Sequence, residues 1–335
     1  MFTAGNPENV RILVVRLGAM GDIVHTLPAV ASLKHSHPGS RLTWVVEAKW
    51  APLLEGNPFV DRVVPLRRGS IASLTRSWRE LRAEPYHIAV DFQGLLKSAV
   101  CADLARPGRI FGFDYPLLRE RAAGLFYSQK TLTRAAHVVD RNLDLAAAAG
   151  ASALLRVFPL PPGQPEGELP PGAFVLASPL AGWRSKQWPT EHYRALAARL
   201  RAELGMPLVV DLPPACADWV RQAGMAAGAV AHVSGLAGLI DATRRAAAVV
   251  GVDSGPLHLA AALGKPGVAI FGPTAPARNG PYGGSLRVLR AADAVTTYKR
   301  RSSISESMQR VAPDQVFEAL HAALGERRSS AGCCA

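Results

Sequence analysis

Long hydrophobic runs are missing from this chain of 335 residues. No apolar segment reaches the roughly 18–20 residues that a membrane-spanning helix needs. The first ten residues, 1–10, are polar and contain no apolar core of the kind found in a signal peptide. These absences argue against a protein held in the membrane by helices, and we expect a cytoplasmic one.

Cysteine and acidic residues are also scarce. The four cysteines form no Cys-x-x-Cys pair and no metal-ligand spacing with histidine, so we expect reduced thiols and no metal site. The 38 Lys and Arg residues outnumber the 26 Asp and Glu residues, which gives a formal charge of +12. Such a charge favours an anionic partner, which could be nucleic acid, anionic lipid or a phosphorylated substrate.

Short β-branched runs alternate with helical stretches in the first half of the chain. Because such a rhythm is typical of β-α-β units, it predicts a parallel sheet with helices on both faces. The predicted strands are 11–15, 42–46, 62–65 and 87–91, and a helix is predicted over 29–35.

A second set of the same elements follows a proline-rich segment. Residues 157–172 contain six prolines, which indicates a linker. We therefore predict an α/β protein of two Rossmann-like halves, residues 1–156 and 173–335. The predicted strands of the second half are 174–177, 207–210, 248–252 and 267–271, and its predicted helices are 190–204, ended by Gly205, and 313–324.

The first candidate site follows the first predicted strand, in the segment 16–22. Gly18 and Gly21 permit a tight turn into a helix, whose N-terminus suits an anion. The spacing is not that of a dinucleotide fingerprint. Asp22 is either a helix-capping residue or a functional acid, and spacing alone does not separate the two.

The second candidate site combines two segments of the second half. Asp253 ends a predicted strand, Ser254 and Gly255 turn into a helix, and His258 lies one turn further on. The amides at this turn could face a diphosphate, or the segment could be an ordinary capped helix with a packed histidine. Lys186, in a loop before a helix, could neutralise a phosphate or be a solvated surface residue.

An arginine-rich stretch is the third candidate. Residues 67–82 contain five arginines and one acid, and include Arg67 and Arg68. They could bind an anionic acceptor or lipid head groups, or form a solvated helix face. No aromatic-interleaved RNA motif and no DNA-reading motif is present.

Taken together, these motifs resemble glycosyltransferase family 9, the ADP-heptose:lipopolysaccharide heptosyltransferases. The similarity runs from about residue 10 to about residue 324, and within the family it is best to heptosyltransferase I. The matching segments are 18–28, 186–189, 253–263, 271–274 and 279–283, with 91–98, 119–120 and 125–127 similar to heptosyltransferase I.

The resemblance implies a GT-B fold, in which two Rossmann-like domains face a cleft, with acceptor binding in the first domain and the nucleotide sugar in the second. The final helix could pack back on the first domain. It implies ADP-L-glycero-D-manno-heptose as donor and the Kdo sugar of Kdo2-lipid A as acceptor. It places the catalytic base on Asp22. Donor binding falls on Gly18, Gly21, Lys186, Asp253, Ser254, Gly255 and His258, and acceptor binding on Arg67, Arg68, Gln93 and Arg119.

One departure concerns the nucleoside. The family often carries a Glu after the second strand of the C-terminal half, whereas this chain offers only Asp218 as a substitute. The expected reaction is an inverting displacement that needs no cofactor or metal, with a divalent ion at most stimulatory. The expected enzyme is a monomer that visits the anionic cytoplasmic face of the inner membrane and binds no nucleic acid. Two alternatives stay open: another member of the family with a different sugar or acceptor, and a basic nucleic-acid-binding protein.

Overall fold

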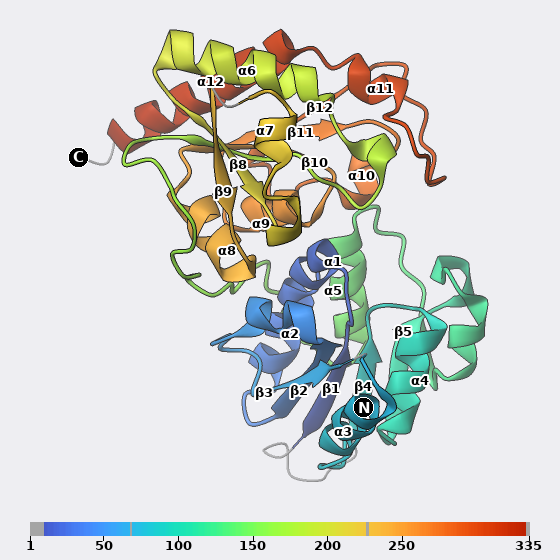
Figure 1. Cartoon of the computed structure of the whole chain (residues 1–335). Coiled ribbons are helices and arrows are strands. Elements are labelled where there is room, and N and C mark those ends of the chain that lie inside the picture. Colours follow the sequence, from blue (N-terminus) through green and yellow to red (C-terminus); the bar gives the residue numbers. More distant parts are fainter. Residues whose placement is uncertain (1–9, 68, 226–227, 333–335) are drawn as a thin grey trace. The chain divides into compact units, whose positions relative to one another are not determined.

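The computed structural model describes residues 10–67, 69–225 and 228–332. The chain divides into two compact units, residues 1–161 and 162–335, and each is described by itself. In each unit a parallel sheet is covered by helices (Figure 1). No helix among the described residues combines the length and apolarity needed to cross a bilayer.

The N-terminal unit contains a six-stranded parallel sheet in the order β3-β2-β1-β4-β5-β6. The inner strand β1 is almost entirely buried, as is usual for a strand covered on both faces. The predicted strands at 11–15, 42–46, 62–65 and 87–91 are confirmed. The strands are β1 (Arg11–Val15), β2 (Arg41–Glu47), β3 (Arg62–Leu66), β4 (Ile88–Asp91), β5 (Arg109–Phe113) and β6 (Gln129–Thr131).

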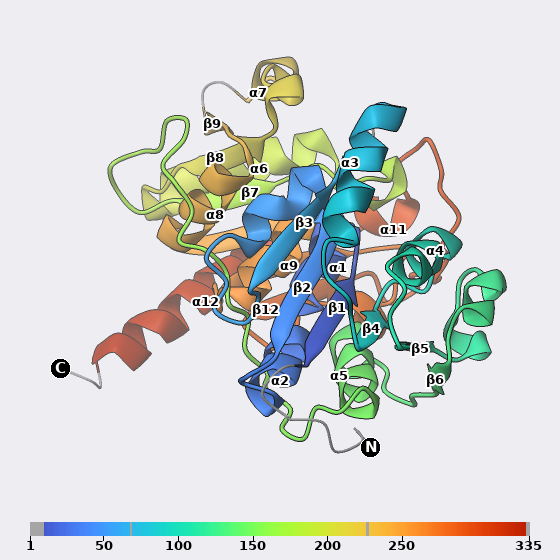
Figure 2. The same cartoon turned by 90° about the horizontal axis from the view of Figure 1, so that it is seen from below.

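Helices of the N-terminal unit connect these strands. α2 packs beside α5, whereas α3 packs on β3 and α4 packs on β1 and β4 (Figure 2). The α-helices are α1 (Met20–Val24), α2 (Leu27–Ser36), α3 (Ile71–Leu81), α4 (Leu96–Leu104) and α5 (Val138–Ala148), and the 3₁₀ segments are η2 (Ala48–Leu54), η3 (Tyr115–Leu117) and η4 (Arg121–Leu125).

The C-terminal unit repeats this topology. Its sheet has the order β12-β11-β10-β7-β8-β9, so that its first and fourth strands, β7 and β10, again lie side by side. The predicted strands of this half are confirmed, whereas β9 and β12 were not predicted. The strands are β7 (Val175–Ser178), β8 (Leu208–Leu212), β9 (Ala229–Val233), β10 (Ala248–Val252), β11 (Gly267–Phe271) and β12 (Leu286–Arg290).

The helices of this unit enclose a core that contains Trp188, Tyr193 and Phe317. α6 has the bounds predicted from sequence, and Gly205 ends it in the left-handed conformation with φ 63°. α12 extends eight residues beyond the prediction and packs on α6, β10, β11 and β12. The α-helices are α6 (Thr190–Leu204), α7 (Trp219–Gln222), α8 (Leu236–Arg245), α9 (Gly255–Ala262), α10 (Pro276–Asn279), α11 (Glu306–Gln309) and α12 (Pro313–Gly332), and the 3₁₀ segments are η5 (Arg184–Lys186) and η6 (Pro214–Cys216).

Part of the proline-rich segment is fixed to the C-terminal unit. The amide of Gln164 donates to the carbonyl of Ala237 over 3.1 Å. The carboxylate of Glu166 accepts from the amide of Gly235 over 2.6 Å, and its carbonyl contacts Nε2 of the buried His232. The second half of the predicted linker is therefore packed structure, and it belongs to the C-terminal unit.

Candidate functional site

Both sheets have the strand order of a doubly wound fold, in which ligands bind beyond the carboxyl ends of the strands where the order reverses. In the N-terminal unit this switch point lies between β1 and β4, and in the C-terminal unit between β7 and β10. The segment with Asp22 follows β1, and the segments with Lys186 and Asp253 follow β7 and β10. Each unit therefore carries one group of predicted residues at its own switch point.

Asp22 is the third residue of α1, where its carboxylate has two contacts. One oxygen accepts from the amide of Ala19 over 3.2 Å, and the other lies 2.8 Å from Nη2 of Arg16. The Asp22 side chain remains 36% exposed. The residue thus caps α1 and also presents a carboxylate to solvent, so the capping role does not remove the chemical one.

Arg16 was part of the sequence motif but received no role there. Its side chain is buried, and Nη1 donates to the carbonyl of Phe92 while Nη2 contacts Asp22. A guanidinium held in this way fixes the direction of the carboxylate. In the sequence, the contact between Arg16 and Asp22 is indicated only by the position of Arg16 directly after a buried strand.

Gln93 joins β4 to the same loop. Its side-chain carbonyl accepts from the amide of Leu17 over 2.8 Å, and its own amide donates to Asp91 over 2.8 Å. Gly18 also belongs to the loop, and a Cβ there would lie 3.0 Å from the Trp50 ring. In this structure Gln93, predicted to bind acceptor, positions the loop that leads to Asp22.

Asp91 is a buried carboxyl beneath this loop that sequence reasoning did not select as a site residue. Tyr127 and Ser98 donate to it over 2.7 and 2.8 Å. Burial raises the pKa of Asp91, and the hydrogen bonds from Tyr127, Gln93 and Ser98 offset only part of that effect.

The predicted acceptor residues lie elsewhere in the same unit. Arg67 follows β3, Arg119 lies between η3 and η4, and both are exposed. The carboxylate of Glu120 accepts from the amide of Leu96 over 2.7 Å and so ties the Arg119 segment to the start of α4. Arg68 lies outside the described residues, and Gly21 is buried within α1.

The C-terminal unit brings the predicted Lys186, Asp253 and His258 together. Nζ of Lys186 lies 2.6 Å from Oδ2 of Asp253, and Nε2 of His258 lies 3.4 Å from Oδ1. Thr274 was not predicted as a site residue, and its hydroxyl donates to Oδ2 of Asp253 over 2.7 Å. These contacts fix a lysine ammonium at the carboxyl ends of β7 and β10.

The charge state of Asp253 follows from these neighbours. Burial alone would raise the pKa of this carboxyl. The hydrogen bond from His258 and the positive charge of Lys186 outweigh burial and hold the pKa of Asp253 well below its usual range. Asp253 is therefore an anion at neutral pH, and its Oδ2 lies 2.6 Å from Nζ of Lys186.

The turn after Asp253 supplies hydrogen-bond donors. Ser254 is the N-cap residue of α9 and Gly255 is its first residue. The first amides of a helix favour negative charge. In α9, Pro256 has no N–H and the amide of Leu257 donates to the carbonyl of Ser254, so the donors of the turn are the amides of Ser254 and Gly255. Within the described part of the chain, Ser254 Oγ is buried and has no hydrogen-bond partner. The turn can therefore bind a phosphate group.

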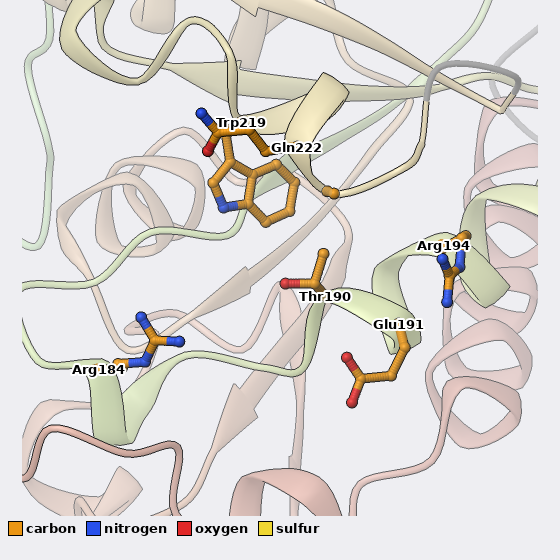
Figure 3. Close-up of a pocket in the computed structure, with 7 residues that line it drawn as sticks. Arg184, Thr190, Glu191, Arg194, Trp219 and Gln222 are labelled. Atoms are coloured by element: carbon orange, nitrogen blue, oxygen red, sulfur yellow. The ribbon is translucent and has the colours of Figure 1, made fainter.

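Asp218 lies apart from this cluster. It is exposed at the start of α7, with its carboxylate 3.0 Å from Arg221. The next residue, Trp219, lines a pocket of about 390 Å³ together with Arg184, Thr190 and Arg194 (Figure 3). In the segment expected to contact a nucleoside, Trp219 rather than Asp218 lines the pocket.

Metal ligands do not gather in the described residues. No group of three or more His, Cys, Asp or Glu side chains among them could hold an ion. At the two switch points, the cations that contact Asp22 and Asp253 are Arg16 and Lys186.

Comparison with known proteins supports one family. A model described as glycosyltransferase family 9 (heptosyltransferase) matches residues 74–308. Lipopolysaccharide heptosyltransferase 1 of Escherichia coli K12 is 33% identical over 84% of this chain and 93% of its own length. The enzyme of the same name from Pseudomonas aeruginosa PAO1 is 35% identical over 82% of each chain.

A solved structure supports the same assignment. The E. coli heptosyltransferase WaaC with ADP is similar with a TM-score of 0.75 and 27% identity, over 92% of this chain and 98% of that chain. The two parallel sheets are those of the GT-B heptosyltransferase structures. With the family model across most of its length and relatives above 30% identity, this chain belongs to glycosyltransferase family 9 and is a heptosyltransferase-type glycosyltransferase.

Proposed function

We propose that this enzyme transfers L-glycero-D-manno-heptose from ADP-heptose to the Kdo of Kdo2-lipid A in the synthesis of the lipopolysaccharide inner core. The main support for this proposal is a cluster of side chains at the β7/β10 switch point, formed by Lys186, Asp253, His258 and Thr274. Its lysine and the amides of Ser254 and Gly255 suit the diphosphate of a nucleotide sugar. The relatives named heptosyltransferase 1 are 30–35% identical, against 25% for those named heptosyltransferase 2, which favours the first heptose.

The proposed reaction is a single displacement with inversion. The acceptor hydroxyl attacks the anomeric carbon while the bond to the β-phosphate oxygen breaks, and the electron pair leaves with ADP. Asp22 takes the hydroxyl proton. Its partial exposure and its fixed contact with Arg16 suit a base that must reach a substrate.

Groups of the C-terminal unit stabilise the negative charge that develops on the leaving group. Lys186 and the amides of Ser254 and Gly255 stabilise the ADP anion as it forms. We expect these groups to suffice without a cofactor, and a divalent ion to be at most stimulatory. Arg67, Arg68 and Arg119 are proposed to bind the anionic groups of the acceptor, in a monomer at the cytoplasmic face of the inner membrane.

The test is ADP release from ADP-heptose with de-acylated Kdo2-lipid A. Asp22→Ala should lower kcat by roughly 10²–10⁴-fold, as expected for loss of a general base, with ADP affinity retained. Asp103→Ala, an exposed acid at the end of α4, is the matched control and should be active. Nuclear magnetic resonance of the product would show whether the anomeric configuration is inverted.

Each result bears on a separate part of the proposal. Turnover that Asp22→Ala does not reduce would remove Asp22 as base and leave it as a helix cap. ADP binding without turnover on this pair would reject the acceptor or the sugar. A panel of core oligosaccharides that already carry one heptose would then decide between the first and a later transfer.

A further inference from the structure

The helix α3 in the N-terminal unit exposes apolar side chains on one face. Ile71, Leu74 and Trp78 lie at positions i, i+3 and i+7 of the helix, which places them on one side. Their exposed fractions are 85%, 42% and 40%. The helix is anchored to the unit by other residues, since Ser77 is buried and donates to the carbonyl of Pro65 over 3.1 Å.

An apolar groove of about 610 Å³ runs beside this face. Leu74, Trp78 and Leu81 of α3 form one wall, and Val100 and Leu104 of α4 form another, with Leu66 at the end of β3. Exposed apolar area of this kind on a protein surface marks a binding site for a protein, a ligand or a membrane.

Positive charge surrounds this face. Arg67 precedes α3, Arg76 and Arg79 lie on it, Arg82 follows it, and all four are exposed. An amphipathic helix with apolar and aromatic residues on one side and arginines on the other is typical of helices that lie in the plane of a membrane interface. The arginines complement anionic head groups, which distinguishes a bilayer from an apolar protein partner.

We infer that α3 and its groove form a membrane-docking site for anionic bilayers. Ile71, Leu74 and Trp78 enter the boundary between head groups and acyl chains, the groove takes a hydrocarbon chain of an anionic bilayer lipid, and Arg76 and Arg79 contact lipid phosphates. This inference deepens the proposed location at the inner membrane and rests on that location, but it does not depend on which sugar is transferred.

The first test places Trp78 in the bilayer. Vesicles of phosphatidylethanolamine and phosphatidylglycerol with brominated acyl chains quench tryptophan that reaches the chain region. The chain has six tryptophans, so the wild-type protein is compared with Trp78→Phe, which keeps an apolar ring. We expect quenching in the wild type and most of it lost in Trp78→Phe. Equal quenching in both would overturn the inference.

The second test measures binding by vesicle sedimentation. Ile71→Ser with Leu74→Ser should weaken binding at least about tenfold, because burial of one Leu-sized side chain shifts an equilibrium by roughly that factor. Val295→Ser with Val288→Ser removes two valines of the C-terminal unit that are exposed by 78% and 41%, and should bind as the wild type does. Equal losses in the two pairs would contradict a role specific to α3.

Charge is tested with a second matched pair. Arg76→Gln with Arg79→Gln should weaken binding about 25-fold at low salt, since each arginine near an anionic surface contributes roughly fivefold. Arg201→Gln with Arg301→Gln changes the net charge equally in the C-terminal unit and should have a smaller effect. If both pairs weaken binding equally, overall charge rather than α3 directs the protein to the membrane.

Failure of this inference is distinguishable from failure of the proposed reaction. Ile71→Ser with Leu74→Ser should keep wild-type turnover on soluble de-acylated acceptor and lose turnover on acceptor embedded in vesicles. Vesicle binding that depends on α3 in a protein without heptose transfer would reject the reaction and keep the docking site. If the serine pair instead abolishes self-association in solution and leaves vesicle binding intact, the face is a contact between copies and the inference is wrong.

Discussion

The two units carry a carboxyl group at equivalent places and give it opposite properties. The fourth strand of the N-terminal sheet ends at Asp91, and the fourth strand of the C-terminal sheet is followed by Asp253. Both are buried, yet the pKa of Asp91 is raised by burial, whereas His258 and Lys186 lower that of Asp253 against the effect of burial. Topology places the acid, and its neighbours decide the direction in which its pKa shifts.

The two units also differ in the acid that pairs with the cation following their first strand. In the N-terminal unit Arg16 pairs with Asp22, which is 36% exposed, whereas in the C-terminal unit Lys186 pairs with Asp253, whose side chain is 8% exposed. The first arrangement leaves a carboxylate partly exposed, and the second holds a partly buried lysine against a buried carboxylate. One unit is suited to taking a proton and the other to neutralising charge.

Removing the ammonium group that pairs with the buried Asp253 should have the largest effect on stability. Lys186→Met leaves Asp253 buried with a negative charge and without its ammonium partner, which should lower the free energy of unfolding by about 3 kcal/mol. Urea unfolding at pH 7 measures this. Lys49→Met, at a lysine that is 67% exposed and 3.9 Å from Glu47, is the control and should change stability by less than about 1 kcal/mol. Equal losses would mean that the Lys186 pair acts as a surface pair.

In the N-terminal unit, loss of a hydrogen bond to the equivalent acid, Asp91, should lower the free energy of unfolding. Tyr127→Phe removes the hydroxyl that donates to Asp91 over 2.7 Å, and should cost about 1.5–3 kcal/mol of unfolding free energy. Tyr298→Phe, at a half-exposed tyrosine, is the matched control. ADP affinity, measured by calorimetry, should be unchanged in both, and a drop in Tyr127→Phe would contradict the separation of the two sites.

Arg16 should matter for turnover through Asp22. Arg16→Met leaves the Asp22 carboxylate without its 2.8 Å contact, and we expect kcat to fall about tenfold with KM for ADP-heptose unchanged. Arg16→Lys keeps the charge and should recover part of kcat. A change in KM alone would show that Arg16 acts on donor binding instead.

The smallest effect is expected in the pH dependence of stability. A carboxyl with a lowered folded pKa stabilises the fold above its unfolded pKa of about 3.9, and this contribution is lost as pH falls. A carboxyl whose pKa is raised in the folded state has the opposite effect: the fold loses stability as the pH rises through that raised pKa. Asp253→Asn should therefore reduce the loss of stability toward acid, and Asp91→Asn should increase it.

Urea titrations at pH 7, 5 and 3.5 would show this difference. The effect is small because each variant changes the titration of a single carboxyl group. If the two variants changed the pH dependence in the same direction, the contrast between the two acids would be wrong.

Sequence patterns predicted the inner parts of the fold well and its margins less well. α6 was predicted with its bounds because its apolar spacing is helical and Gly205 ends it. β9 was missed because most of its residues are only partly buried and its Ala-rich sequence lacks strand character. The arginines of α3 were noticed, but the apolar face beside them was not.

The candidate site shows the same division. The motifs identified Asp22, Lys186, Asp253 and His258 as chemically interesting, and the structure brings the last three together. It also adds contacts that no local pattern contains, since Thr274 donates to Asp253 from 21 residues further along the chain. Asp218 was chosen by position along the chain, and the structure adds its contact with Arg221 at the surface.

The sequence by itself determined the parallel α/β fold and the residues that follow its inner strands, because hydrophobic periodicity and glycine turns act locally. Only the tertiary structure decided what those residues do to one another. Lys186 and Asp253 are 67 residues apart, and Tyr127 and Asp91 are 36 apart. The pKa of each acid depends on burial and on neighbours from helices and loops elsewhere in the chain, which come together only once the unit has folded.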